Sequence, residues 1–289
     1  MRLDAEAQAS ARRGIAAFAL LSIGGMLLLT VLFHAAGGSL HSTAGTAVVL
    51  LGMALPSVAR VIVVRFVDTG FAAPLPLRDG KRPRLQVLLV PLLLVVAIYG
   101  VAYGGAALAG VSRAAPVWNG AGKIAANVLV NGVLVSIPGF IGAFGEEWGW
   151  RGYLQPRLDQ LGVPFSPWVL AGVAVMYHAP FIVALGYVNA GGVLVSLGLF
   201  ALLELGLAPT WTYVTYRLRS VWAAVWIHTL HNTFSQVLFP KSLGVGDERL
   251  LGESGLLPCA GYLLVAGACV LAARRRSKTF QAFLRDSVR

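Results

Sequence analysis

The residues of this chain whose types could do chemistry begin with the segment Glu146–Arg151, Glu-Glu-Trp-Gly-Trp-Arg, which follows a long apolar run. Two carboxylates and a guanidinium are costly there, because an ionised group at the centre of a membrane helix costs roughly 2.5 to 3.5 kcal/mol. On a helix, Glu147 and Arg151 share a face, whereas Glu146 points about 100° away. The spacing therefore predicts an ion pair between Glu147 and Arg151 that leaves the Glu146 carboxylate available for chemistry.

Further costly polar groups lie in two later apolar runs. His178 lies within residues 168–185, and His228 and Asn232, four residues apart, share a helix face within 221–239. Each group alone has a structural explanation, as a packed and hydrogen-bonded histidine or as a pair that binds a neighbouring helix. Together with the glutamates, these histidines and this asparagine are the residue types that catalyse hydrolysis. Glutamate and histidine deprotonate a water, and histidine and asparagine donate hydrogen bonds to an oxyanion.

The elements that must position these groups are membrane helices. Of the 289 residues, 57% are apolar and 12% are charged, and the mean hydropathy is +0.75, which is not a soluble globular composition. Eight apolar runs are each long enough to span a bilayer. They cover about residues 14–36, 42–67, 85–110, 124–144, 168–185, 193–216, 221–239 and 256–273. We therefore expect an all-α fold, a polytopic membrane bundle of about eight transmembrane helices with a buried polar site, built as one integral membrane domain over residues 1–289.

The distribution of the basic residues indicates a membrane topology. The formal net charge is +11, and 18 of the 23 lysines and arginines fall on one side of an eight-span bundle, in the N-terminus, the second, fourth and sixth loops and the tail. This positive-inside pattern predicts two cytoplasmic termini and a lipid bilayer as partner, and argues against nucleic acid. It also puts Glu146–Arg151 near the cytosolic face, unless that helix is tilted or sunk into the bundle. The Arg-rich, Ala-rich and Gly-rich composition favours a bacterial source and thus the inner membrane.

The three polar motifs carry a family resemblance. Glu146-Glu147-x-x-x-Arg151, a histidine in the next span, and His228-x-x-x-Asn232 two spans later resemble the motifs of the CPBP family of intramembrane proteases. That group includes CAAX prenyl endopeptidases and bacterial abortive-infection and bacteriocin-immunity proteins. The resemblance covers about residues 129–239, the expected catalytic core. It implies an eight-helix bundle and an endopeptidase that hydrolyses a peptide bond in a membrane-associated protein or peptide. Carried over residue by residue, the roles are water activation by Glu146 and His178, support by Glu147 and Arg151, and oxyanion binding by His228 and Asn232.

One position departs from the family pattern. The second motif of the family is usually Phe-x-x-x-His, and here the residue four before His178 is Ala174. The loss of bulk leaves the chemistry intact but alters the helix packing or the substrate wall around His178. The resemblance also leaves metal dependence open. We favour water activated directly by the glutamate, with no cofactor. The alternative is a zinc ion bound by Glu146, His178 and His228, a set of the His2Glu type.

Other polar or reactive residues within the spans have structural explanations. Glu204 is expected to pair with Arg60 or Arg217 or to cap a break at Pro209, with substrate contact as the alternative. The two cysteines lie ten residues apart in the last apolar run, about 15 Å along a helix, which is too far for a disulfide. They are Cys259 and Cys269, and we expect both to serve in packing.

Two other functions are compatible with the same residues. A catalytically silent membrane scaffold or bacteriocin-immunity protein would keep the fold, and its phenotype would survive Glu146→Gln. A secondary transporter also uses carboxylates near the bilayer midplane, but it is typically built from two halves with matching broken helices. No such repeat is evident in the sequence. The sequence does not specify an oligomeric state.

Overall fold

The computed structural model describes residues 4–73, 84–111, 121–134, 136–188, 190–240 and 246–275, and these are helical with short connections. The longer helices are α1 (Ala5–Ala35), α2 (Thr43–Phe66), α3 (Arg84–Leu108), α5 (Ser136–Gly149), α7 (Ser166–Leu185), α8 (Val193–Leu218), α9 (Val221–Asn232) and α11 (Leu256–Arg275). Shorter pieces are α4 (Ala121–Asn127), η2 (Val128–Leu134), η3 (Trp150–Leu154), α6 (Gln155–Gln160) and η4 (Thr233–Leu238). Many basic residues of the second loop and the tail, including Arg78, Lys81 and Arg276, lie outside the described residues.

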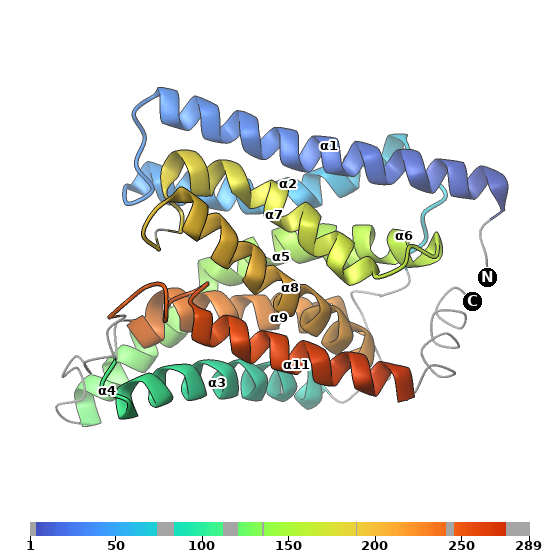
Figure 1. Ribbon diagram of the computed structural model, residues 1–289. Coiled ribbons are helices and arrows are strands. Elements are labelled where there is room, and N and C mark those ends of the chain that lie inside the picture. Colours follow the sequence, from blue (N-terminus) through green and yellow to red (C-terminus); the bar gives the residue numbers. More distant parts are fainter. Residues whose placement is uncertain are drawn as a thin grey trace.

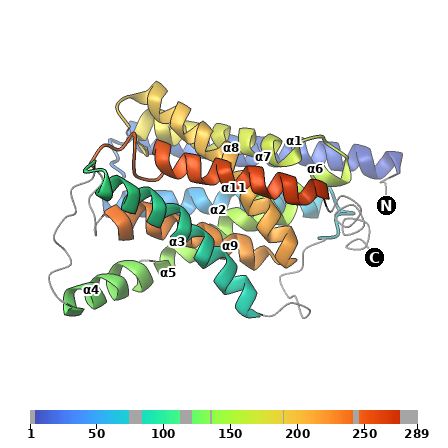
Figure 2. The same ribbon diagram turned by 60° about the horizontal axis from the view of Figure 1, so that its bottom comes forward.

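The helices form a bundle with two outer groups and a polar interior. Helices α1, α2 and α7 pack together on one side, and α3, α9 and α11 lie on the other (Figure 1). Between them, α5 contacts α2 and α9, and α8 contacts α7 and α11. Helix α4 projects away from the bundle (Figure 2). The two inner helices therefore lie where a polar site can be shielded from lipid.

The outer surface of the bundle is apolar. Leu108, Leu194, Leu264 and Val101 are 75–93% exposed, as lipid-facing side chains of a membrane protein are. Seven helices in the described part of the chain are long and apolar enough to cross a bilayer. They are Ala5–Ala35, Thr43–Phe66, Leu85–Leu108, Val128–Gln160, Ser166–Leu185, Val193–Leu218 and Leu256–Ala273. The chain is thus the expected polytopic helical bundle and an integral membrane protein.

The expected span 221–239 is helical but is not among those seven. It consists of the twelve-residue helix α9, which continues into the π-helical turn η4. Its histidines and asparagine make it less apolar than the other spans, and most of its residues are buried within the bundle. The beginning of α1 and the end of α11 lie at the same end of the bundle (Figure 1). This agrees with an even number of crossings, with α9 as the eighth.

Close packing between α2 and α5 positions the acidic segment. A Cβ at Gly145 would lie 2.6 Å from the Met53 carbonyl oxygen, and one at Gly149 would lie 2.6 Å from the Pro56 carbonyl oxygen. The Ser57 hydroxyl donates to the Gly145 carbonyl across the same contact, at 2.5 Å. Because glycines let two membrane backbones approach, α2 holds α5 directly behind Glu146 and Glu147.

Candidate active site

Glu147 is fixed by partners from two helices. It is fully buried, and Nη1 of Arg151 donates to both of its carboxylate oxygens at 2.9 and 3.0 Å. The Nδ1 atom of His228 on α9 lies 3.0 Å from its Oε1. The predicted ion pair with Arg151 is therefore present, and the contact with His228 extends it to a triad.

Arg151 lies in the π-helical turn η3 and is 3% exposed. Its guanidinium carbon lies 5.3 Å from the centroid of the Trp211 ring, a cation–π contact. Two of its nitrogens, Nε and Nη2, have no hydrogen-bond partner among the described residues. Arg151 is therefore held between a carboxylate and an aromatic face, with donor capacity to spare.

Glu146 has a different environment from its neighbour. It is 4% exposed, and its Oε2 accepts a hydrogen bond from the Trp150 indole at 3.2 Å. No ion pair of Glu146 is found within the described residues. The carboxylate borders a cavity. Glu146 is thus oriented by one neutral donor, and its remaining acceptor capacity is open to a molecule in the cavity.

His178 on α7 is oriented by its own helix. Its Nδ1 lies 2.9 Å from the Ala174 carbonyl oxygen. A carbonyl only accepts, so the proton is on Nδ1, and Nε2 of the neutral ring is an acceptor. The ring packs against Tyr177 and Phe200, each with centroids 4.8 Å apart. Ala174, the position that departs from the family pattern, lines the cavity next to this histidine.

The two histidines of α9 serve different networks. His228 turns toward Glu147 on α5. His231 turns toward α3 and α11, with its Nδ1 3.1 Å from the Tyr99 hydroxyl and 3.0 Å from the Tyr262 hydroxyl. Asn232 follows His228 by one turn and lines the same cavity. Helix α9 therefore contributes His228 to the contact with Glu147 and His231 to the contacts with α3 and α11.

One cavity of about 270 Å³ is lined by every residue that the motifs indicated. These residues are Glu146, Glu147, Arg151, His178, His228 and Asn232. They come from α5, η3, α7 and α9, and the structure brings all of them together. The cavity is also lined by polar or aromatic residues that the motifs did not indicate: Tyr187, Glu204, Trp211, His231, Gln236 and Glu253.

Glu204 differs from its predicted role. Arg60 packs over the Trp148 ring at 4.0 Å and Arg217 is exposed, so neither holds Glu204. Helix α8 continues through Pro209, so no break needs a cap. Glu204 instead borders the cavity. A glutamate within an apolar run is the sequence feature that indicates a functional role for Glu204. The spacing along one helix does not reveal which neighbouring helix the Glu204 side chain faces.

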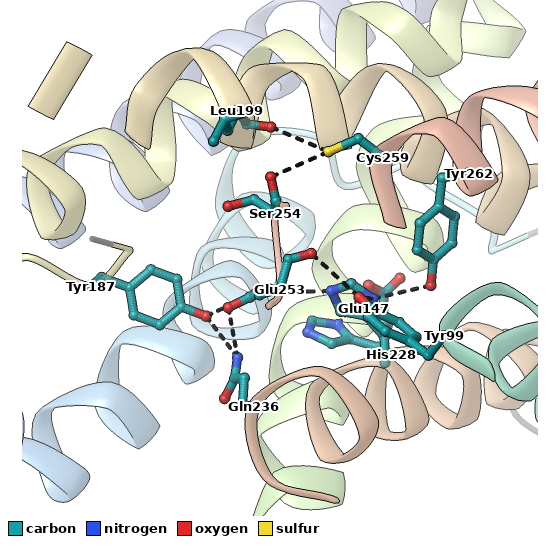
Figure 3. A network of polar contacts seen from close by, with 11 residues as sticks. Tyr99, Glu147, Tyr187, Leu199, His228, Gln236, Glu253, Ser254, Cys259 and Tyr262 are labelled. Carbon is teal, nitrogen blue, oxygen red and sulfur yellow. Dashed lines mark hydrogen bonds and ion pairs between the residues drawn. The ribbon is translucent and has the colours of Figure 1, made fainter. Parts of the chain in front are cut away.

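Glu253, in the segment before α11, lines the cavity and belongs to a polar network with Tyr187 and Gln236 (Figure 3). Glu253 accepts hydrogen bonds from the Tyr187 hydroxyl at 3.2 Å and the Gln236 amide at 3.0 Å. Its Oε1 lies 3.8 Å from Nε2 of His231. Burial acts to raise the pKa of the Glu253 carboxyl, but the contact with His231 and the other polar neighbours, Gln236 among them, together hold this pKa below its ordinary value. Nothing in the spacing of the sequence indicated that this loop residue would reach the site.

The cavity does not lie near the end of the bundle that holds the two termini. Its histidines and the glutamates of α5 and α8 lie partway along their helices, and its lining continues to Leu40, Tyr187 and Glu253. Those residues belong to loops at the end opposite the start of α1 (Figure 1). The site is therefore sunk into the bundle, the exception that the sequence left open, and the side of the membrane that it faces stays a prediction.

The proposed zinc ligands can be tested against this geometry. Within the described residues, no group of three or more histidine, cysteine, aspartate or glutamate side chains is arranged so that it could hold a metal ion. Of the candidate ligands, Glu146 is bound by the Trp150 indole and His228 by Glu147. These contacts leave Oε1 of Glu146 and Nε2 of His228 available to a metal ion, so the set Glu146, His178 and His228 stays an alternative to direct activation of water.

Comparison with models of known protein families gives a match. Residues 125–234 match a family model described as type II CAAX prenyl endopeptidase Rce1-like. The match includes all six motif residues and overlaps most of the expected core at 129–239. No curated protein gives a significant match to the chain.

Proposed function

Because the Rce1-like match supports membership of the CPBP/CAAX protease family, we propose that this chain is an intramembrane endopeptidase that cleaves a peptide bond in a membrane-associated protein or peptide. The observation that carries the proposal is the convergence of the six motif residues on one buried cavity. A glutamate, two histidines and an amide around a cavity of about 270 Å³ are the groups that peptide hydrolysis uses.

The first step assigns water activation to Glu146 and His178. The Glu146 carboxylate takes a proton from a water whose position is fixed by a hydrogen bond to Nε2 of His178. The resulting hydroxide attacks the carbonyl carbon of the scissile bond. Burial away from solvent strengthens these contacts, because the interior screens charge less than water does.

The second step assigns the oxyanion to His228 and Asn232. The His228 Nδ1 already faces Glu147 at 3.0 Å, so an imidazole that also donates from Nε2 must be protonated, with Glu147 as its counter-ion. The Asn232 amide is the second donor. When the tetrahedral intermediate collapses, the carbon–nitrogen bond breaks and Glu146 returns its proton to the leaving amine.

Glu147 and Arg151 are positioning residues in this scheme. Arg151 balances the charge of Glu147, and Glu147 in turn holds the His228 ring. We assign no metal or other cofactor to the reaction. The proposed setting is a bacterial inner membrane with both termini in the cytoplasm, and the proposed domain is a single membrane unit with its catalytic core at about 129–239.

The direct test compares membrane peptides from cells that express wild-type protein, Glu146→Gln or His178→Gln. We expect mass spectrometry to find the same uncleaved peptides accumulating in both variants. Glu248→Gln, an exposed glutamate that does not line the cavity, is the matched control and should give the wild-type pattern. If both site variants are inserted and give that pattern as well, the protein is a silent scaffold and the proposal is wrong.

A further inference from the structure

The cavity carries more negative than positive residues. Four glutamates line it, Glu146, Glu147, Glu204 and Glu253, against a single arginine, Arg151. Arg151 is already paired with Glu147. Even with His228 and His231 both protonated, the resulting three cations are outnumbered by the four glutamates when all four are ionised. A cavity with low-dielectric walls concentrates such a field and favours ligands of opposite sign.

Within the described part of the chain, Glu204 shares with Glu146 the lack of an ion-pair partner. It is only 7% exposed, and its carboxylate makes no hydrogen bond or ion pair within the described residues. The charges that act on it come from Arg151 and His228 and, unfavourably, from Glu146 and Glu147. Ionising a buried carboxyl group that has no partner is costly, and a cationic ligand beside it would offset that cost.

Glu253 differs from Glu204 because its carboxylate is already held by Tyr187 and Gln236. It adds negative potential but has little acceptor capacity left. The described acidic and histidine side chains form no group that could hold a metal ion. A cationic group carried on a flexible chain needs only one carboxylate, and the apolar side chains of Phe200, Leu203 and Leu207 beside Glu204 suit its aliphatic stem.

From the unpartnered Glu204 carboxylate and the acidic lining, we infer that Glu204 binds a positively charged group of the substrate, an ammonium or a guanidinium. This inference rests on the proposed function for its view of the ligand as a peptide. The shared chemistry has two sources, a lysine or arginine side chain and a free amino terminus. In either case Glu204 is a specificity residue that holds the peptide while Glu146 acts on the scissile bond.

Binding of defined peptides to the full-length chain in nanodiscs of zwitterionic lipid tests the inference. The probes are fluorescent, N-acetylated decapeptides of leucine and alanine with one lysine, arginine, glutamine or methionine placed at each position in turn. A glutamine peptide with a free amino terminus tests the second source. Empty nanodiscs correct for partition into lipid. We expect the best cationic probe to bind at least about tenfold more tightly than its glutamine counterpart, the scale of a charge-assisted hydrogen bond.

Glu204→Gln keeps the shape of the side chain and removes its charge. We expect the ratio between cationic and glutamine probes to fall close to one in this variant and to stay unchanged in Glu248→Gln. Equal binding of all probes by wild-type protein would overturn the inference, whether or not Glu204→Gln folds. A ratio that persists in a folded Glu204→Gln protein would also overturn it.

Mass spectrometry of the same mixtures separates this inference from the proposed function. Binding with a preference for cationic probes but without cleavage would support the Glu204 site and contradict the proposed protease function. Cleavage by wild-type protein without that preference would support the proposed protease function and contradict the Glu204 site.

Discussion

Nδ1 of His228 lies 3.0 Å from Oε1 of Glu147, so that α9 and α5 are joined through one carboxylate. Arg151 binds the same carboxylate from one turn further along its own helix. The positions of an oxyanion donor and of the acidic segment are thereby coupled. A substitution of Arg151 will therefore also change the position of His228, and the reverse holds as well.

Arg151→Met is expected to lower the free energy of unfolding by about 3 to 5 kcal/mol, because it leaves Glu147 buried without its cation. The double variant Glu147→Gln, Arg151→Met should lose less than the single one, since no uncompensated charge remains. Reversible denaturation in detergent micelles measures both. Arg249→Met, which removes an exposed ion pair with Asp247, is the control and should change stability little. An Arg151→Met protein as stable as that control would show that the triad is dispensable.

Gly149→Ala is expected to destabilise the protein by about 1 to 3 kcal/mol, the usual cost of overpacking. Its added Cβ would lie 2.5 to 2.6 Å from Pro56 atoms of α2, including main-chain atoms. Because the shift would move Glu146, peptide cleavage should fall as well. Gly139→Ala on the same helix is the matched control, since nothing lies within 4 Å of its added carbon. Equal melting temperatures of the two variants would refute the close contact.

The sequence allowed the bundle and the polar motifs to be predicted, because both depend on patterns within single helices. Runs of apolar residues reveal spans, and a spacing of four places Glu147 with Arg151 and His228 with Asn232. The contact between His228 and Glu147 joins residues 81 positions apart, and helix spacing carries no information about such pairs. Glu253 reaches the cavity from a loop for the same reason, outside the matched segment 125–234.

Peptide cleavage by purified protein is expected to persist in 1,10-phenanthroline and EDTA, because the proposed mechanism uses only side chains. Metal analysis of the active preparation should find zinc well below one ion per chain. Glu146→Gln provides the blank for contaminating peptidases in the same assay. Activity that disappears with chelator and returns with one equivalent of zinc would instead favour Glu146, His178 and His228 as ligands, in a local arrangement that differs from the one described.

The proposed orientation places the loop-lined end of the cavity on the non-cytoplasmic side, because Leu40, Tyr187 and Glu253 lie at the end of the bundle opposite the start of α1. Two exposed positions report on the two ends: Ser39 in the loop before α2, and Ala9 near the start of α1. In a chain without native cysteines (Cys259→Ala, Cys269→Ala), a membrane-impermeant maleimide should label Ser39→Cys in intact bacterial cells. It should label Ala9→Cys only after the membrane is permeabilised. Labelling in the reverse order would place the termini outside and the loop-lined end of the cavity on the cytoplasmic side, and would overturn the proposed orientation.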